Sequence, residues 1–561
     1  MVVFSKNNRW MRVAITLPIV LVLLRIVFRA ALQNDAVIAA LDGWLDSLQE
    51  YEEHLAKHIY LHNNYAPVDA ENRAVPSKLV EGSIPDGLEG VFLQNGPNPI
   101  PHHLGRKRYH WFDGHGHLHS LRIKGGELLY SNSFIPTPRY EVEKKLDKEY
   151  FFRFGELNGM VGLLKALLLQ DTRLAKHKLD RLRAGQANTH TIMTKQNRFY
   201  AVHEASLPFE IELNQDGSIA SAVGHETFGN ILDYPVSAHP KVDYESGNLL
   251  FHSYAADPEL SERDGSFKFG EFSSETGHVE SYFGIRTNDN HVCFGHDMVF
   301  TKNWFVVIDN SVHFDPKQIF NSTGSAFSYT DSNLRIGLAQ RHRSDATSDD
   351  VIWFDFGAPH VILHQLNAWE DEDGVVVMWS PCGDNFDLNI DKASNSYYMA
   401  EFRMDPKTGK SEMTVIDDRY NVEFPRIRLD YVGRFGRYAT ATIMDTSLGG
   451  DALFRGYAKY DLLEKKTSQV VIYRQGDVAG EAVVIPKPGT SESHEFFVGT
   501  WVRNTSQDKS FFVLYDGESG EQVARVEIPF RVPHGFHCEW LDEEQLRGHF
   551  AHHAERKKSI K

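Results

Sequence analysis

From about residue 75 onward one pattern recurs along the chain: an apolar run, a short turn of acidic residues and glycine, and a second apolar run. Examples are residues 211–223 (IELNQDGSIASAV), 272–284 (FSSETGHVESYFG) and 511–528 (FFVLYDGESGEQVARVEI). Asp, Asn and Gly supply the backbone geometry of tight turns, so each stretch predicts a β-hairpin. So many hairpins require an arrangement with few free sheet edges. The pattern therefore predicts an all-β fold, either a propeller or a large barrel.

Composition narrows the classes of function. A net charge of −17 over 561 residues argues against nucleic acid as a partner, because phosphate binding requires clustered Lys and Arg. The three cysteines cannot form a disulfide framework, so we expect a reducing compartment, the cytosol or a plastid. The chain has 28 histidines, several of them inside apolar runs. Buried histidines need partners, which predicts a hydrogen-bonded network or a metal site.

The first 34 residues differ from the rest. An apolar run extends from Val13 to Leu24, shorter than the ~20 residues that a membrane span requires. Three interpretations remain open: an anchor whose Arg25 and Arg29 reach the interface, a cleaved signal or transit segment, or a buried helix. We predict four segments: a hydrophobic membrane-anchor or targeting segment at 1–34, a helical lead-in at 35–74, the propeller at 75–550 and a basic tail at 551–561.

Two stretches have helical character. Residues 37–58 show apolar spacings of three and four, which predicts an amphipathic helix. Residues 155–184 have an apolar first half, with MVGLLKALLL at 160–169, and a basic second half. The second stretch predicts either a helix packed against the core or an amphipathic element that lies on a membrane. The sequence leaves both interpretations open.

The densest group of histidines lies between residues 102 and 119. His115, His117 and His119 alternate along the chain, so on a strand they would share one face. A metal site is one interpretation of this face. Because glycine and small residues are interspersed, we favour a structural strand on the surface or partly buried.

Four other histidines share a different context. Each lies in or beside an apolar run, next to a turn-forming residue or a polar break; they are His239, His296, His364 and His537. Their separations of 57, 68 and 173 residues form no local motif, but they suit ligands that converge from several blades of a propeller. The alternative is that each is an ordinary core histidine. His534 precedes His537 by three residues, and the residues alone do not decide whether these two act together.

The four histidines belong to a larger set of eight distinctive segments, four of which contain them. They are VFLQNGPNPI (91–100), YHWFDGHGHLH (109–119), AHPKVD (238–243), GHDMVFTKNW (295–304), HQLNAWED (364–371), VEFPRI (422–427), GEAVVIPKPG (480–489) and FRVPHGFHCEW (530–540). In this order they resemble the signature segments of the carotenoid cleavage oxygenase family, which includes plant epoxycarotenoid dioxygenases and the vertebrate retinal pigment epithelium isomerase. The resemblance covers residues 75 to 545.

The resemblance implies a seven-bladed β-propeller with a helical cap and an Fe²⁺ ion on its axis. The implied iron ligands are His239, His296, His364 and His537, and His534 is not among them. The implied carboxylates behind the ligand rings are Glu204, Glu423 and Glu481. Imidazole suits ferrous iron, and carboxylates behind the rings fix their tautomers.

The implied activity is oxidative cleavage of a carotenoid or apocarotenoid double bond by O₂, which gives two carbonyl products. Rival hypotheses are an isomerase or retinoid- or stilbene-processing member of the family, and a non-enzymatic propeller with structural histidines. Pro136 stands where stilbene-cleaving relatives have lysine, which disfavours a stilbene substrate. His115 and His117 replace a usual acid and Met, and we expect Cys538 to pack rather than coordinate. A lipophilic substrate also predicts contact with a membrane surface.

Overall fold

The computed structural model describes residues 34–48, 58–100, 109–157, 159–254, 262–263, 265–287, 291–314, 327–343, 345–386, 395–445 and 453–559. Within these ranges strands predominate, and the expected all-β class is confirmed. Most of the strands lie in antiparallel sheets of at least four strands. The predicted segment 1–34 lies outside the described residues except for Asn34.

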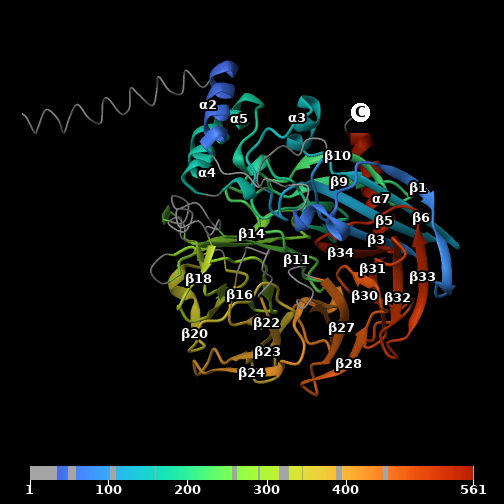
Figure 1. Cartoon of the computed structure of the whole chain (residues 1–561). Helices are drawn as coiled ribbons and strands as arrows, with labels where there is room; N and C mark the ends of the chain where they lie inside the picture. The colour runs from blue at the N-terminus through green and yellow to red at the C-terminus, as the bar shows by residue number, and fades with distance from the viewer. Residues whose placement is uncertain are drawn as a thin grey trace, which may run out of the picture.

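The first sheet joins the two ends of the strand-rich region. Its order is β1 (Asn72–Pro76), β6 (Glu127–Phe134), β5 (His115–Lys124), β3 (Gly90–Asn95) and β34 (His537–Asp542), and β4 (Pro97–Asn98) also pairs with β5. Strands β3 and β34 are antiparallel, with Asn95 opposite His537. Figure 1 shows these strands, one blue and one red, side by side. The last strand therefore closes onto one of the first.

Four-stranded sheets follow in chain order. They are β7–β10 (His190–Met193, Phe199–Val202, Phe209–Leu213, Ile219–His225), β11–β14 (Lys241–Val242, Leu249–Tyr254, Phe267–Phe272, Val279–Ile285), β15, β16, β19 and β20 (Val299–Phe300, Trp304–Asp309, Arg335–Gln340, Ile352–Asp355), and β21–β24 (Asn367–Glu370, Val376–Gly383, Tyr397–Met404, Ser411–Asp417). A short pair is formed by β17 (Val312–Phe314) and β18 (Phe327–Tyr329).

The remaining strands form one ten-stranded sheet. Its members are β25 (Val422–Ile427), β26 (Tyr438–Asp445), β27 (Leu453–Asp461), β28 (Lys466–Ile472), β29 (Asp477–Ala479), β30 (Val483–Pro486), β31 (Phe496–Asn504), β32 (Lys509–Asp516), β33 (Gln522–Ile528) and β2 (Lys78–Gly82). The predicted hairpins are present as β9–β10, β13–β14 and β32–β33. Gly217 and Gly277 provide positive φ values of 78° and 70° in the first two turns.

Helices gather at one end of the molecule. Figure 1 shows α2 (Asp35–Leu48), α3 (Pro138–Leu146), α4 (Gly159–Lys165) and α5 (Asp171–Lys176) on the same side of the sheets. The helix predicted at 37–58 begins at Asp35, and residues 49–57 lie outside the described part. The stretch predicted as one helix at 155–184 is broken into α4, a π-helical turn (Ala166–Gln170), α5 and a 3₁₀ turn (Arg181–Arg183).

The apolar side chains of this broken stretch pack mainly against α2. Leu169 is buried in a cluster with Ile38 and Leu45, and Val161, Leu164 and Leu168 are partly buried beside it. Two cations of its basic second half, which would meet head groups in the membrane interpretation, pair with α2 instead: Arg173 with Asp42, and Lys176 with Asp35. The core-packing interpretation therefore holds for most of the described apolar side chains here.

The last helix, α7 (Glu543–Ser559), runs across the predicted boundary between residues 550 and 551. Its His549 and His553 are buried, and its Arg556 and Lys557 pair with Glu212 on β9. The predicted boundary between residues 74 and 75 falls inside β1, which begins at Asn72. The division into four segments stays a prediction. In the part of the chain that the structure describes, no helix has the length and apolar character needed to cross a membrane.

Candidate metal centre

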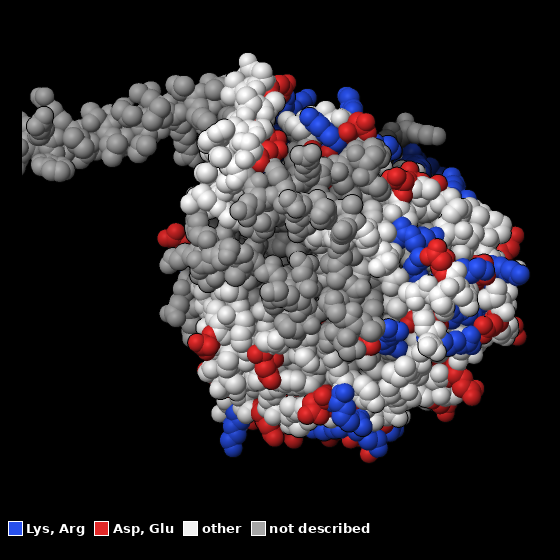
Figure 2. Space-filling view, in the orientation of Figure 1, with Lys and Arg blue, Asp and Glu red and all other residues white. Residues whose placement is uncertain are grey.

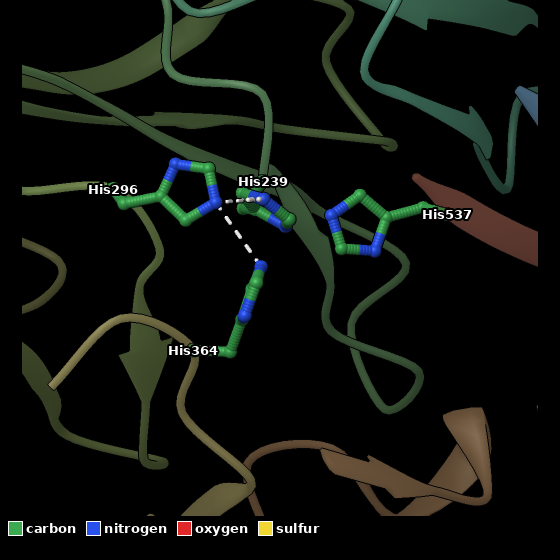
Figure 3. Close-up of side chains that lie close together, drawn as sticks. All are labelled: His239, His296, His364 and His537. Atoms are coloured by element: carbon green, nitrogen blue, oxygen red, sulfur yellow. Dashed lines mark hydrogen bonds between the residues drawn. The ribbon is translucent and has the colours of Figure 1, made fainter. Parts of the chain in front are cut away.

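Four histidines from four different parts of the chain meet at one point, as Figure 3 shows. His239 lies just before β11, His296 before β15, and His364 before β21, whereas His537 is the first residue of β34. They are the four that the sequence singled out. Sheet pairing brings His537 to the others, because β34 is fixed against β3.

The rings are arranged as ligands of a single ion would be. The Nε2 atom of His296 lies 3.1 Å from the Nε2 atoms of both His239 and His364. For a metal–imidazole bond of about 2.1 Å, two ligands at a right angle are about 3.0 Å apart. One ligand nitrogen from each of the four rings lies within 4.8 Å of the others. His239, His364 and His537 are buried, and His296 is nearly so.

A carboxylate lies behind three of the rings. The Nδ1 atom of His364 donates to Glu423 at 2.6 Å, and the Nδ1 atom of His537 lies 3.4 Å from Glu481. Glu204 lies 3.0 Å from the Nδ1 atom of His296. With the Nδ1 proton directed at a carboxylate, the Nε2 atom carries a lone pair that points to the centre.

Burial opposes protonation of the histidine rings, because a positive charge is poorly solvated there. Desolvation, together with the neighbouring histidines, holds the pKa of His239 well below its usual value, and desolvation does the same for His537. Desolvation also lowers the pKa of His364, but the charge and hydrogen bond of Glu423, together with the charges of Asp297 and Glu481, outweigh it and the net shift is upward. Glu481 is ionised, because Arg426 and His537 overcome the desolvation that would raise its pKa.

Phe424 completes the wall of the site on the side of Glu423. Its backbone is left-handed (φ 49°), and its N–H donates to the Glu423 carboxylate. The ring centroid lies 4.9 Å from that of His364 and 5.2 Å from that of His537. A left-handed non-glycine residue is uncommon and costly, and here the conformation directs the N–H of Phe424 at the carboxylate behind His364.

Several residues of the site were missed in the sequence. Asp297 lies 3.8 Å from the Nδ1 atom of His239 and is paired with Lys241 at 2.7 Å. His190 stacks on His239, with ring centroids 5.7 Å apart, and lies 3.3 Å from Glu539. Asp297 directly follows His296, so its place in the sequence could have indicated it as a site residue. His190 and Glu539 lie far apart in the sequence, and no local pattern links them to the site.

A cavity of about 70 Å³ adjoins His239, His364 and His537. Its lining combines apolar side chains, among them Leu366 and Phe424, with charged ones that are mostly paired. Arg426 binds both carboxylate oxygens of Glu481, at 2.8 and 2.9 Å. The centre therefore borders a small space in which charges are neutralised in pairs.

The other histidines predicted as candidates lie elsewhere. His534 is buried among Tyr65, Trp111 and Phe454, and it is not a member of the four-histidine group. His102 and His103 lie outside the described residues. The strand with His115, His117 and His119 is structural as predicted, but the expected surface or partly buried position is wrong.

The β5 histidines are buried because each finds a partner. His115 lies 2.9 Å from Glu143 on α3, His117 stacks on Phe134, and His119 bonds the Tyr130 hydroxyl at 2.7 Å. These contacts fasten β5 to α3 and β6.

The chain matches a known protein family over most of its length. The model of the family described as "Retinal pigment epithelial membrane protein" matches residues 65–542. The carotenoid 9,10(9',10')-cleavage dioxygenase 1 of Pisum sativum is 31% identical over 527 residues, covering 89% of this chain and 92% of the relative. The chloroplastic 9-cis-epoxycarotenoid dioxygenase NCED6 of Arabidopsis thaliana is 29% identical, covering 87% and 82%.

Solved structures share the fold. The lignostilbene dioxygenase of Pseudomonas brassicacearum superposes with a TM-score of 0.71 at 20% identity, covering 87% of this chain and 99% of the other. A variant of the Synechocystis apocarotenoid oxygenase gives a TM-score of 0.67 at 20% identity, covering 85% and 96%. At this identity the likeness concerns the fold alone.

Proposed function

The chain belongs to the retinal pigment epithelial membrane protein family, as its sequence segments predicted, and from this membership and the four-histidine centre we propose that it is an iron(II)-dependent dioxygenase. Its substrate is a carotenoid or apocarotenoid, one double bond of which is cleaved by O₂ into two carbonyl products. The relatives that carry such activities in their names are 31% and 29% identical to this chain over most of its length, whereas the stilbene-cleaving enzyme is 20% identical, which favours this activity over that of a stilbene- or retinoid-processing member.

One observation carries the metal-dependent proposal. His296 and His364 both direct their Nδ1 atoms at carboxylates, yet their Nε2 atoms lie 3.1 Å apart. A cation between them would bind the lone pairs of both neutral rings. With His239 and His537, four imidazoles converge on this one point, which favours a metal centre over a scaffold in which each histidine has a structural partner of its own.

The residues of this chain have clear tasks in such a reaction. His239, His296, His364 and His537 would hold iron(II) as neutral ligands, which leaves the ion its full charge. Bound iron(II) would supply the activation of O₂ for addition across a double bond. Glu204, Glu423 and Glu481 would hold the ring tautomers and orientations. Phe424 and Leu366 would exclude water and contact an apolar polyene.

We also propose that the sheets form seven blades under a helical cap. The ten-stranded sheet divides into β25–β28 and a group of β31, β32, β33 and β2. With the six-stranded sheet and the four sheets of four strands, this division yields seven units, and the β3–β34 pairing would close the ring. The helices α2 to α5 would form the cap.

A membrane surface is the proposed source of the lipophilic substrate. The outer side of α2 exposes Trp44 (58%) and Leu48 (53%), and Met160 on α4 is 53% exposed. In Figure 2 the ridge of α2 is largely free of charged side chains, whereas both signs of charge are interspersed over the described sheets in view. Such an apolar ridge suits insertion at a lipid interface. Three of the relatives are named as chloroplastic, which supports a plastid location.

The decisive experiment combines metal content with product analysis. Purified protein should retain about one iron per chain and convert members of a carotenoid and apocarotenoid panel into pairs of carbonyl products that incorporate ¹⁸O from ¹⁸O₂. Iron retention without oxygen incorporation would support isomerisation instead. A protein that neither retains added Fe²⁺ nor cleaves any member of the panel would refute the proposal.

A further inference from the structure

A second group of metal-ligating side chains lies where α7 packs against β9, and it shares no residue with the four-histidine centre. It consists of Glu210 on β9 with His552 and His553 on α7, and one ligand atom from each lies within 4.8 Å of the others. Figure 1 shows α7 in red beside β9 and β10. These residues belong to none of the segments that carry the proposed reaction.

Glu210 has one oxygen with no partner. The side chain is buried, and its Oε2 atom accepts from Arg198 at 2.5 and 3.1 Å. Its Oε1 atom is buried and has no hydrogen-bond partner among the described residues. A buried carboxylate oxygen without a partner is costly, so an ion or a water molecule is expected against it.

His553 has the same deficit. It is 5% exposed, and neither ring nitrogen has a hydrogen bond with acceptable geometry among the described residues, although Nδ1 lies 3.0 Å from Glu212. Its neighbour His552 is half-buried, and the two ring centroids are 5.1 Å apart. Three potential ligands thus converge between a strand and a helix, and two of them are buried with polar atoms that lack a hydrogen bond among the described residues.

The neighbouring His549 shows what a structural histidine in this helix looks like. Its Nδ1 atom donates to the carbonyl of Asn197 at 2.9 Å, and its Nε2 atom accepts from the N–H of Leu213 at 3.0 Å. Both nitrogens are used, and the side chain already anchors α7 to the β7–β10 sheet. His553, one helical turn later, has no comparable backbone partners.

We propose that Glu210, His552 and His553 form a zinc site that fastens α7 to β9. Two imidazoles and one carboxylate are a common zinc ligand set, with water in the fourth position. Three cations (Arg198, Arg556 and Lys557) pair with the acidic residues around the site, which disfavours ions that rely on oxygen ligands alone. The site would secure the helix that directly follows β34, the strand that begins with His537.

The test uses the full chain loaded with iron, to which Zn²⁺ is added before unbound metal is removed. Zinc and iron are then counted together. The expected result is one zinc per chain in addition to the iron, and a melting temperature that rises on addition of Zn²⁺. His552→Ala should lose the zinc and the thermal response but keep the iron, which also reports that the variant folds.

Two further variants make the result interpretable. His553→Gln should lose zinc in the same way, whereas His342→Ala removes a half-exposed histidine elsewhere and should retain both metals. Wild-type protein that takes up zinc only in exchange for iron, or takes up none, would overturn the proposal and leave an ordered water molecule against Glu210. Full zinc retention by both His552→Ala and His553→Gln would overturn it as well. Because iron is counted in the same sample, these outcomes are distinguished from a failure of the four-histidine centre to hold iron.

Discussion

Replacing Glu423 by Gln tests whether the carboxylates tune the metal centre. Glu423 is 2% exposed and accepts from the Nδ1 atom of His364 at 2.6 Å. A hydrogen bond to a charged group contributes about 1.5–3 kcal/mol. Gln can still present an oxygen to Nδ1, so mainly the negative charge is lost, and the loss is at the lower end of this range, about 1.5 kcal/mol. We expect iron binding about tenfold weaker, since 1.36 kcal/mol corresponds to a factor of about ten.

Glu423→Ala should cost more. The backbone N–H groups of Phe424 and His364 also donate to this carboxylate, and both would lose their acceptor. Each buried unsatisfied group costs about 1–3 kcal/mol, so we expect roughly 100-fold weaker iron binding and a lower melting temperature.

The assay is a chelator competition for Fe²⁺ alongside turnover. Glu401→Gln is the matched control, because Glu401 is equally buried and bonded to Trp379 and Lys465, away from the centre. It should lose stability without loss of iron affinity. Equal iron affinity and turnover in wild type, Glu423→Gln and Glu423→Ala would refute the reasoning.

Three other predictions follow from particular contacts. His537→Ala should abolish activity and iron retention, whereas His534→Ala should keep most of both; the reverse pattern in metal analysis would contradict the ligand assignment. Burial opposes ionisation of Glu143, but Arg139 and His115 lower its pKa to about 2 from 4.5. The stability that ionised Glu143 contributes through Arg139 and His115 is therefore present above pH 4.5 and is lost as the pH falls towards 2. Glu143→Gln should cost about 3 kcal/mol at pH 7 and progressively less in denaturant titrations at acid pH; a cost that does not change with pH would argue against it. In a chain that lacks residues 1–34, Trp44→Glu should reduce sedimentation with liposomes, whereas Ile472→Glu, at an equally exposed site (61%) on β28, should not. Equal sedimentation of the two variants would count against a docking ridge on α2.

Local sequence predicted the hairpins well because their turns are decided within a few residues. Between β9 and β10, for instance, the Asp216 carboxylate accepts from the N–H of Ser218 and Gly217 supplies the positive φ, both within the turn itself. The burial of β5 was not predictable in this way. His115, His117 and His119 are tolerated inside because Glu143, Phe134 and Tyr130 happen to face them, and only the folded chain reveals these partners.

The candidate centre likewise contains residues that the sequence indicated and residues that only the folded chain reveals. The four histidines were singled out from similar local contexts, and the family resemblance selected them as a set. Arg426, which neutralises Glu481, and His190, which stacks on His239, depend on pairings across 55 and 49 residues, for which the sequence has no local pattern. The two interpretations of residues 155–184 stayed open in the sequence for a related reason: its apolar side chains and cations meet α2, over 100 residues earlier.

Long-range carboxylate contacts also explain how ligands so far apart in sequence can form a centre before any ion binds. Asp297, next to His296, pairs with Lys241, two residues after His239, and accepts from the N–H of Gln365, next to His364. Glu204 accepts from the N–H of Ala238 and lies against His296, so it links the same segments a second time. Arg426 binds both Glu481 and the carbonyl of Cys538, which fixes the segment of His537. Because these side chains order the ligand segments through the protein itself, the binding energy of the ion need not be spent on ordering them.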